Sequence, residues 1–192
     1  MLEVVKVGGG VCRPDWVPAL LDWLEARARA GSLLVVCGGG VHADTVRSEQ
    51  QRLAYDDLTA HRQALLAMEQ TAWWLQAAWR ARHGRYCPVN TSAGAGTLWT
   101  PRQLLEDEAA LPASWAITSD SLAAWLAGRQ RAGVLTLLKA VDTGEQVGTA
   151  ALWARQGWVD PAFPHYAEAA ACRVRLLGQR AWATVGPSAD KP

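Results

Sequence analysis

The two stretches VVKVGGG (residues 4–10) and SLLVVCGGG (residues 32–40) decide the fold expected for this chain. Each is an apolar, largely β-branched run that stops at three consecutive glycines, as a buried strand does before a tight turn. An apolar pattern with helical spacing lies between them and ends near Gly31, and another helix is expected from about Val41. Strands that alternate with helices in this way predict a parallel sheet covered by helices.

The remaining sequence continues this alternation. Further strands are predicted at Val134–Leu138 and around Arg173–Leu177, and helices over Asp56–His83 and from Leu122 to about Gln130. Residues 89–100 are rich in Gly, Ser and Thr and are expected to form a loop, and residues 114–118 a brief extended segment. The predicted fold is a three-layer α/β/α sandwich with a mainly parallel central sheet. It forms one domain over residues 1–186, with a flexible C-terminal tail at 187–192.

Composition excludes several classes of function. The 192 residues carry a formal net charge of +1 and are half apolar, so no basic field for nucleic acid is expected. No apolar run reaches the length of a membrane span, and the N-terminus lacks the features of a signal peptide. The four cysteines stand singly, which predicts free thiols and no metal site. We therefore expect a cytoplasmic protein that acts on a small molecule, without nucleic-acid or membrane partners.

The two strand–glycine–helix junctions are predicted to bind anions. Glycine lets backbone N–H groups approach a phosphate closely, and the N-terminus of the following helix adds further donors. Neither junction matches the P-loop or the dinucleotide-binding motif. The chain has only three lysines, and two of them, Lys6 and Lys139, end apolar strands beside turns. A compact ammonium group in that position is suited to a phosphate.

These motifs together resemble those of the amino acid kinase family. The segments VVKVGGG (4–10) and VVCGGGVHADTVR (35–47) are similar to the two glycine loops of that family, and LKAVDTG (138–144) is similar to its nucleotide loop. AH at 60–61 and AME at 67–69 resemble its dimer-helix signature. WAITSDSL (115–122) resembles the kinases of methanofuran biosynthesis, which add a phosphate to an aminomethylfuran phosphate. The match covers about residues 1–180 in the same order.

The resemblance implies an ATP-dependent kinase and a role for each matching residue. Lys6 would bridge the transferring phosphoryl group, and Asp120 would orient the lysine and the phosphates. Gly8 and Gly9 would supply N–H donors. The nucleotide would also be bordered by Thr118, Lys139, Val141 and Asp142. The acceptor would be held by Gly38, Gly39, Gly40 and His42. Mg²⁺ would be held mainly by the phosphates of ATP, so no protein metal ligands are expected.

Other interpretations of the same residues stay open. Asp120 is also placed to be an N-terminal helix cap, and His61 to be a packed or surface histidine. Gly10 stands where the family usually has serine, and the family's late lysine has no counterpart here. The missing late lysine favours a non-catalytic nucleotide- or oxyanion-binding homologue, whereas Lys6 and Asp120 together favour an enzyme. A carboxylate kinase of amino-acid metabolism is the remaining alternative.

The helix predicted over Asp56–His83 has an unusually broad apolar face. Leu58, Leu65, Leu66, Met68, Trp73 and Leu75 all belong to this face. So wide a stripe predicts contacts beyond the helix's own sheet, and we expect a homodimer or a higher homo-oligomer built on this helix.

Overall fold

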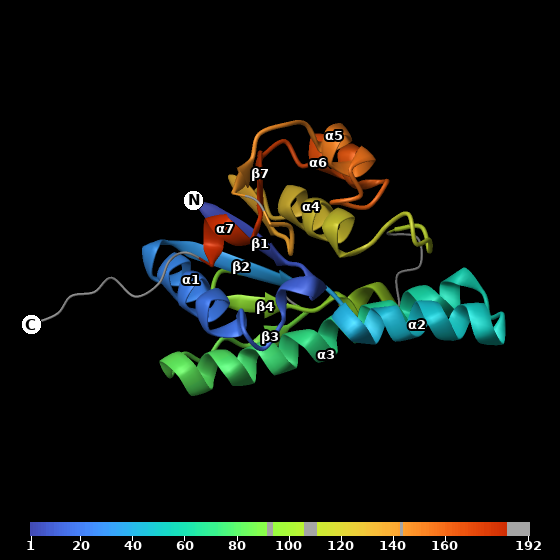
Figure 1. The fold of residues 1–192 in the computed structure, drawn as a ribbon, viewed down its shortest axis with the longest axis horizontal. Helices are drawn as coiled ribbons and strands as arrows, with labels where there is room; N and C mark the ends of the chain where they lie inside the picture. The colour runs from blue at the N-terminus through green and yellow to red at the C-terminus, as the bar shows by residue number, and fades with distance from the viewer. Residues whose placement is uncertain (92–93, 106–110, 143, 184–192) are drawn as a thin grey trace, which may run out of the picture.

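The computed structural model describes residues 1–91, 94–105, 111–142 and 144–183. Within these residues the chain forms a seven-stranded sheet in the order β3-β4-β2-β1-β5-β7-β6 (Figure 1). Neighbouring strands are parallel except for β6, which pairs antiparallel with β7 at one edge. The strands are β1 Leu2–Val7, β2 Ser32–Cys37, β3 Val89–Asn90, β4 Thr97–Trp99, β5 Val134–Leu138, β6 Glu145–Gln146 and β7 Arg173–Leu177.

Helices cover both faces of this sheet (Figure 1). One side carries α4, α5 and α6, and the other carries α1, α7 and part of the long helix α3. The helices are α1 Val17–Ala30, α2 Gly40–Leu53, α3 Asp57–His83, α4 Ser119–Arg129, α5 Ala150–Arg155, α6 Phe163–Ala169 and α7 Gln179–Trp182, with short 3-10 helices at Gly9–Val11 and Pro101–Leu105. The described residues thus form the three layers that the sequence predicts.

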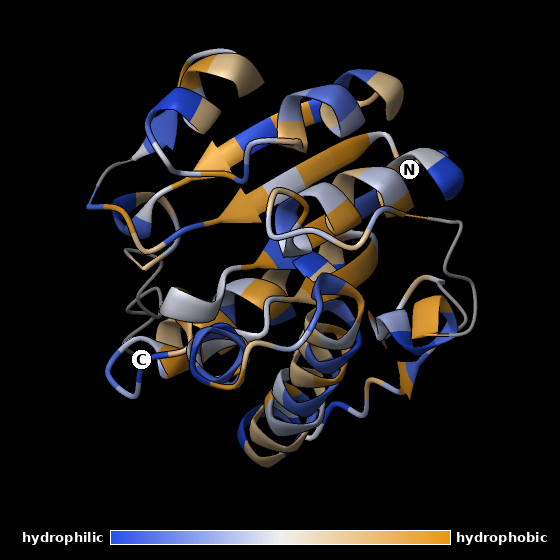
Figure 2. Ribbon diagram, turned by 90° about the vertical axis from the view of Figure 1, so that its right-hand side faces the viewer, coloured by the Kyte–Doolittle hydropathy of each residue, from blue (hydrophilic) through white to orange (hydrophobic). Residues whose placement is uncertain are grey.

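The sheet separates two apolar cores. Successive residues of a strand point to opposite faces, so Val4 packs with Leu34 in the core under α4, whereas Val5 packs with Val35 in the core under α1. Figure 2 shows the apolar strands between the helical layers. Burial on both faces explains why β1, β2 and β5 are continuous apolar runs.

Helix α3 contributes to both cores, which accounts for the width of its apolar face. Leu65 and Met68, near its start, belong to the core under α4. Ala72, Leu75 and Trp79, further along, belong to the core under α1. Most of the broad stripe is therefore buried within this chain.

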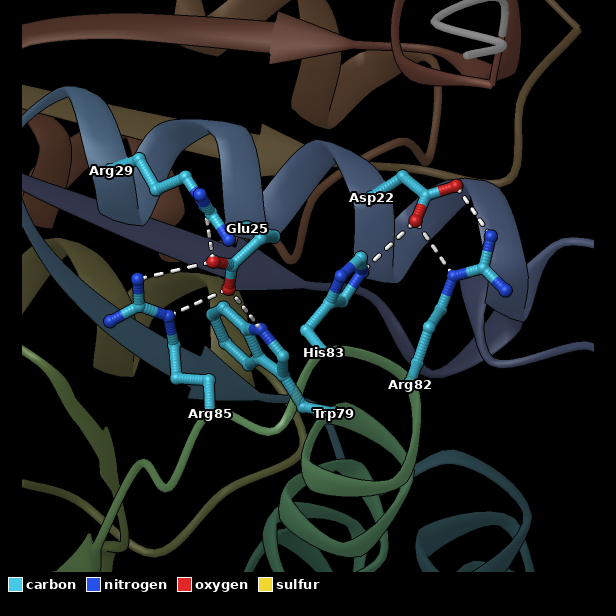
Figure 3. A network of polar contacts seen from close by, with 7 residues as sticks. All are labelled: Asp22, Glu25, Arg29, Trp79, Arg82, His83 and Arg85. Carbon is cyan, nitrogen blue, oxygen red and sulfur yellow. Dashed lines mark hydrogen bonds and ion pairs between the residues drawn. The ribbon is translucent and has the colours of Figure 1, made fainter.

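Charged side chains fix the far end of α3 to α1 (Figure 3). Glu25 of α1 accepts a hydrogen bond from Nε1 of Trp79 at 2.9 Å and pairs with Arg85 at 2.6 Å. The hydrogen bond from Arg85, against the opposing effect of burial, lowers the pKa of the Glu25 carboxyl to about 2. Asp22, one turn earlier, pairs with Arg82 at 2.7 Å. This network holds the C-terminal end of α3, while the N-terminal end faces the glycine loops.

Several sequence predictions need correction. Residues 89–100 contain the short strands β3 and β4, which sequence reasoning missed because Pro88 and a Gly-rich stretch interrupt them. Residues 114–118 are not extended but form a turn, in which the N–H of Ile117 donates to the carbonyl of Ser114. The elements β6, α5 and α7 were also not predicted from the sequence. The predicted tail at 187–192 lies outside the described residues.

The four cysteines are in the state that the sequence predicts. Cys12, Cys37, Cys87 and Cys172 are free thiols, as predicted. In the part of the chain that the structure describes, no helix is long and apolar enough to cross a membrane.

Candidate active site

Two lysines and one aspartate meet at the carboxyl ends of the central strands. Lys6 lies near the end of β1, Lys139 directly follows the neighbouring β5, and Asp120 lies in the first turn of α4. Nζ of Lys6 is 2.7 Å from Oδ1 of Asp120, and Nζ of Lys139 is 2.6 Å from Oδ2. All three side chains are buried or nearly so. The structure therefore joins three residues that lie far apart in the sequence into one ionic cluster.

The location of the cluster follows from the topology. The chain builds the sheet outward from β1 in two directions, first through β2 and later through β5. In parallel sheets, the carboxyl ends of strands beside such a change of direction form a crevice in which ligands bind.

Asp120 is not the cap of α4. Asp160 takes that role from a distant segment, because its Oδ2 accepts hydrogen bonds from the N–H of Thr118 at 2.9 Å and from the N–H of Ser121 at 3.0 Å. The hydroxyl groups of Thr118 and Ser121 also donate to Asp160. The carboxylate of Asp120 is left to pair with the two lysines, so the cap interpretation does not hold.

The cluster perturbs the pKa values of its members. Burial raises the pKa of Asp120, but the charges of Lys6 and Lys139 outweigh it and hold this pKa below its usual range. Burial, together with repulsion from Lys6, lowers the pKa of Lys139 from 10.5 to about 8, although Asp120 acts in the opposite direction. One carboxylate thus balances two ammonium groups only in part.

The two glycine loops touch each other beside this cluster. A Cβ added at Gly9 would lie 2.4 Å from Cα of Gly40, and one added at Gly39 would lie 2.6 Å from Cβ of Ala43. Gly40 has a φ of +54°, which glycine adopts without strain. A Cβ at Gly8 would lie 3.7 Å from Nζ of Lys6. The glycines therefore allow the two loops to pack directly and leave the lysines just behind the first loop.

The N–H groups of these glycines are not equally open to a ligand. The N–H of Gly8 donates to the carbonyl of Leu138 at 3.0 Å, and that of Gly38 donates to the carbonyl of Val7 at 2.8 Å. This corrects the donor role expected for Gly8 and limits Gly38 to shaping the loop. Among the described residues, the N–H groups of Gly9, Gly39 and Gly40 have no backbone partner.

A cavity of about 250 Å³ opens between the two loops. Its walls come from the first half of α2, the N-terminal half of α3 and residues 114–122. Leu65, Met68 and Leu122 contribute apolar side chains to its wall, and Asp44, Arg47 and Asp57 contribute charged ones. Gly9, Gly10 and the second glycine loop form its inner end, so the cavity leads to the glycines in front of the lysine–aspartate cluster.

Sequence reasoning missed several residues of this cavity. Arg47, Asp57 and Trp115 line it but were not predicted, and His61, interpreted as a packed or surface residue, lines it as well. Burial lowers the pKa of His61. Trp115 was quoted only as part of a motif, and it reaches the cavity because the turn at 114–118 folds against α2. That contact has no signature in local sequence.

Of the other predicted residues, some line the cavity and some lie outside its wall. Thr118 lines the cavity. His42 is exposed to solvent and is not among the described residues that line the cavity. Val141 packs against the core under α4. Asp142 is exposed and pairs with Arg180 at 2.8 Å, which lowers its pKa.

The site fits phosphate groups. N–H groups without a backbone partner, a loop that any Cβ would obstruct, and a cluster with more positive than negative charge are all suited to an anion. In the described residues there is no group of three or more His, Cys, Asp or Glu side chains that could hold a metal ion.

Similar folds occur among solved structures of nucleotide kinases. Uridylate kinase from Archaeoglobus fulgidus superposes with a TM-score of 0.64 at 17% identity, over 93% of this chain and 91% of that one. UMP kinase from Ureaplasma parvum has a TM-score of 0.66 at 14% identity, over 95% of this chain and 92% of that one. UMP kinase from Bacillus anthracis has a TM-score of 0.62 at 12% identity, over 92% of this chain and 86% of that one. This chain has the same fold as these uridylate kinases. The predicted fold class is therefore confirmed. No protein-family model matches the sequence, and no curated protein does.

Proposed function

We propose that this chain is an ATP-dependent phosphotransferase that acts on a small anionic acceptor. The Lys6–Asp120–Lys139 cluster, directly behind a glycine loop that opens into a cavity, is the observation that carries the proposal. The amino acid kinase fold supports it.

The chemistry proposed is phosphoryl transfer by positioning and charge neutralisation. Lys6 stabilises the negative charge of the transferring phosphoryl group, and the N–H of Gly9 donates to it. Lys139, Val141 and Asp142 border the nucleotide with Thr118. The N–H groups of Gly39 and Gly40 hold the acceptor at the inner end of the cavity. Mg²⁺ would be held by the phosphates of ATP and would supply further charge neutralisation there. Asp120 keeps both ammonium groups in place before substrate arrives.

The proposed acceptor is a phosphorylated aminomethylfuran of methanofuran-like cofactor synthesis. The resemblance of residues 115–122 to the kinases of that pathway motivates this choice, and Trp115 and Thr118 of that segment line the cavity. The apolar side chains of Leu65, Met68 and Leu122 in the wall suit a small ring. A cytoplasmic location and a homodimer belong to the same proposal.

A binding protein without catalytic activity is the main rival, favoured by the missing late lysine. Incubation with ATP, Mg²⁺ and a panel of acceptors, with phosphorylated aminomethylfurans first and amino-acid carboxylates second, tests both. Release of ADP and the mass of the product show whether an acceptor is phosphorylated. Stabilisation by ATP without any product, across the whole panel, would favour the rival.

The variant Lys6→Met identifies the site of the reaction. Removal of one preorganised donor to the transferring group lowers the rate about 10²- to 10³-fold. Lys139 still neutralises Asp120 in this variant, so we expect it to fold. Arg129→Met, on the exposed end of α4, is the control and should keep the rate. A Lys6→Met protein with more than about a tenth of the wild-type rate would contradict the role of Lys6.

A further inference from the structure

Arg47 is the only lysine or arginine among the described residues that line the cavity. Lys6 and Lys139 lie behind the first glycine loop and are already paired with Asp120. An anionic acceptor in the cavity would therefore find one side-chain cation there, and that cation is Arg47.

The guanidinium of Arg47 is placed by Trp115. Cζ of Arg47 lies 4.4 Å from the centre of the Trp115 ring, a cation–π arrangement between α2 and the turn at 114–118. Arg47 lies two turns along α2 from Gly40 of the second glycine loop, and both residues line the cavity.

Trp115 is itself held by a chain of hydrogen bonds. Its Nε1 donates to Oε1 of Gln50 at 2.6 Å, and Nε2 of Gln50 donates to Oδ1 of Asp57 at 2.8 Å. Gln50 thus links α2 to the turn and to the first residue of α3. These bonds fix the aromatic ring against which Arg47 packs in the wall of the cavity.

Arg47 has no carboxylate partner within the described residues, whereas eight of the sixteen arginines of this chain pair with one there. Its side chain is exposed, and Asp44, one turn earlier on the same helix, forms no ion pair with it. A positioned guanidinium without a counterion is suited to a bidentate contact with a phosphate or carboxylate.

We infer that Arg47 binds the oxyanion of the acceptor, that Trp115 orients it, and that Gln50 is a positioning residue that holds Trp115. The inference rests on the proposed function for the identity of the acceptor. It adds the residue that makes the cavity select an anionic acceptor over its neutral counterpart.

Calorimetric binding to the full chain, without nucleotide, tests this inference. The probes are a phosphorylated aminomethylfuran, the matching unphosphorylated alcohol and a carboxylate analogue of the same size. The wild type should prefer the phosphate over the alcohol. In Arg47→Met the phosphate should bind about 10- to 100-fold more weakly, since a hydrogen bond to a charged group is lost, while the alcohol is unaffected. Comparison of the affinities for the carboxylate analogue and the phosphate shows which of the two oxyanions the site prefers.

Further variants separate binding from structure. Arg47→Lys keeps the charge but loses the two parallel donors, so it should recover the preference only in part. Gln50→Leu should weaken phosphate binding less than Arg47→Met does, and should raise KM more than it lowers kcat. Arg52→Met, on the same helix and paired with Glu49 at the surface, is the matched control and should behave as the wild type does.

Two results would overturn the inference. One is a wild type that binds phosphate and alcohol equally well. The other is an Arg47→Met protein, folded by circular dichroism, that keeps the wild-type ratio of the two affinities. A wild type that shows the Arg47-dependent preference but phosphorylates no acceptor would leave this inference standing and remove the proposed catalytic function.

Discussion

The charge balance of the site depends on one residue, Asp120. Its carboxylate contacts two ammonium groups, which leaves a net positive charge in a buried position behind Gly8. A buried charge without full compensation is costly to keep in a fold. The excess positive charge of the cluster therefore favours a role in anion binding over a role in stabilising the fold.

Lys139 should give the folded chain a measurable pH dependence. Its pKa is lowered from 10.5 to about 8, so between these values the unfolded chain binds a proton that the folded chain has released. This contribution to the free energy of unfolding is therefore lowest below about pH 8 and rises with pH through the window. A shift of this size corresponds to roughly 3 kcal/mol.

Urea unfolding of the wild type and of Lys139→Met, at about pH 7.5 and about pH 10, measures this effect. The wild type should gain stability relative to the variant as the pH rises. Cys12, whose pKa burial raises to about 11, acts in the opposite direction but is present in both proteins, so the difference isolates Lys139. A difference that does not change with pH would show that Lys139 titrates normally.

At the scale of elements, Asp160 connects the start of α4 to the segment before α6. It accepts hydrogen bonds from two backbone N–H groups in the first turn that carries Asp120. Asp160→Ala should lower the free energy of unfolding by about 1–3 kcal/mol, because buried donors lose their partner. Phosphoryl transfer should also fall, since the first turn of α4 positions Asp120.

Thr149→Ala is the control for this prediction. Thr149 caps α5 by accepting from the N–H of Leu152, away from the site. Its loss should lower stability slightly and leave the specific activity of the folded protein unchanged. If Asp160→Ala had the same pattern as Thr149→Ala, the link between the cap and the site would be refuted.

The elements that sequence predicted well are those whose pattern is local. The predicted bounds of the strands Ser32–Cys37 and Val134–Leu138 agree with the structure, because a strand buried on both faces is a largely apolar run bounded by turns. The predicted strand Arg173–Leu177 is also present, although its two arginines break the apolar run. The short strands β3 and β4 carry no such run. They exist because β2 offers an edge to pair with, which is a property of the assembled sheet.

The same distinction holds for the candidate site. Lys6, Lys139 and the glycines could be chosen from their places at strand ends, and Asp120 from a family resemblance. Arg47 could not be chosen, because its significance arises from packing on Trp115, 68 positions away in the chain. The role of Asp160 could not be predicted either, since its partners at the start of α4 precede it by about 40 residues.

At the scale of the whole molecule, one apolar surface remains on α3. Leu66 is 42% exposed, Trp73 50% and Trp74 42%, although Leu65, Met68, Ala72 and Leu75 of the same helix are buried in the two cores. Seven or eight residues separate Leu66 from the two tryptophans, so these side chains share one face of the helix. Exposed tryptophans grouped in this way are typical of protein interfaces.

We predict that this face joins two copies of the chain in a homodimer, and sedimentation velocity measures it. The variant Leu66→Glu, Trp73→Glu should be monomeric, because two buried carboxylates in each copy would oppose association. It should remain folded, since both side chains are exposed in the single chain. Tyr86→Glu, at an exposed position beyond the end of α3, is the control and should stay dimeric. A wild type that sediments as a monomer at micromolar concentration, or a double variant that stays dimeric, would refute the α3 interface.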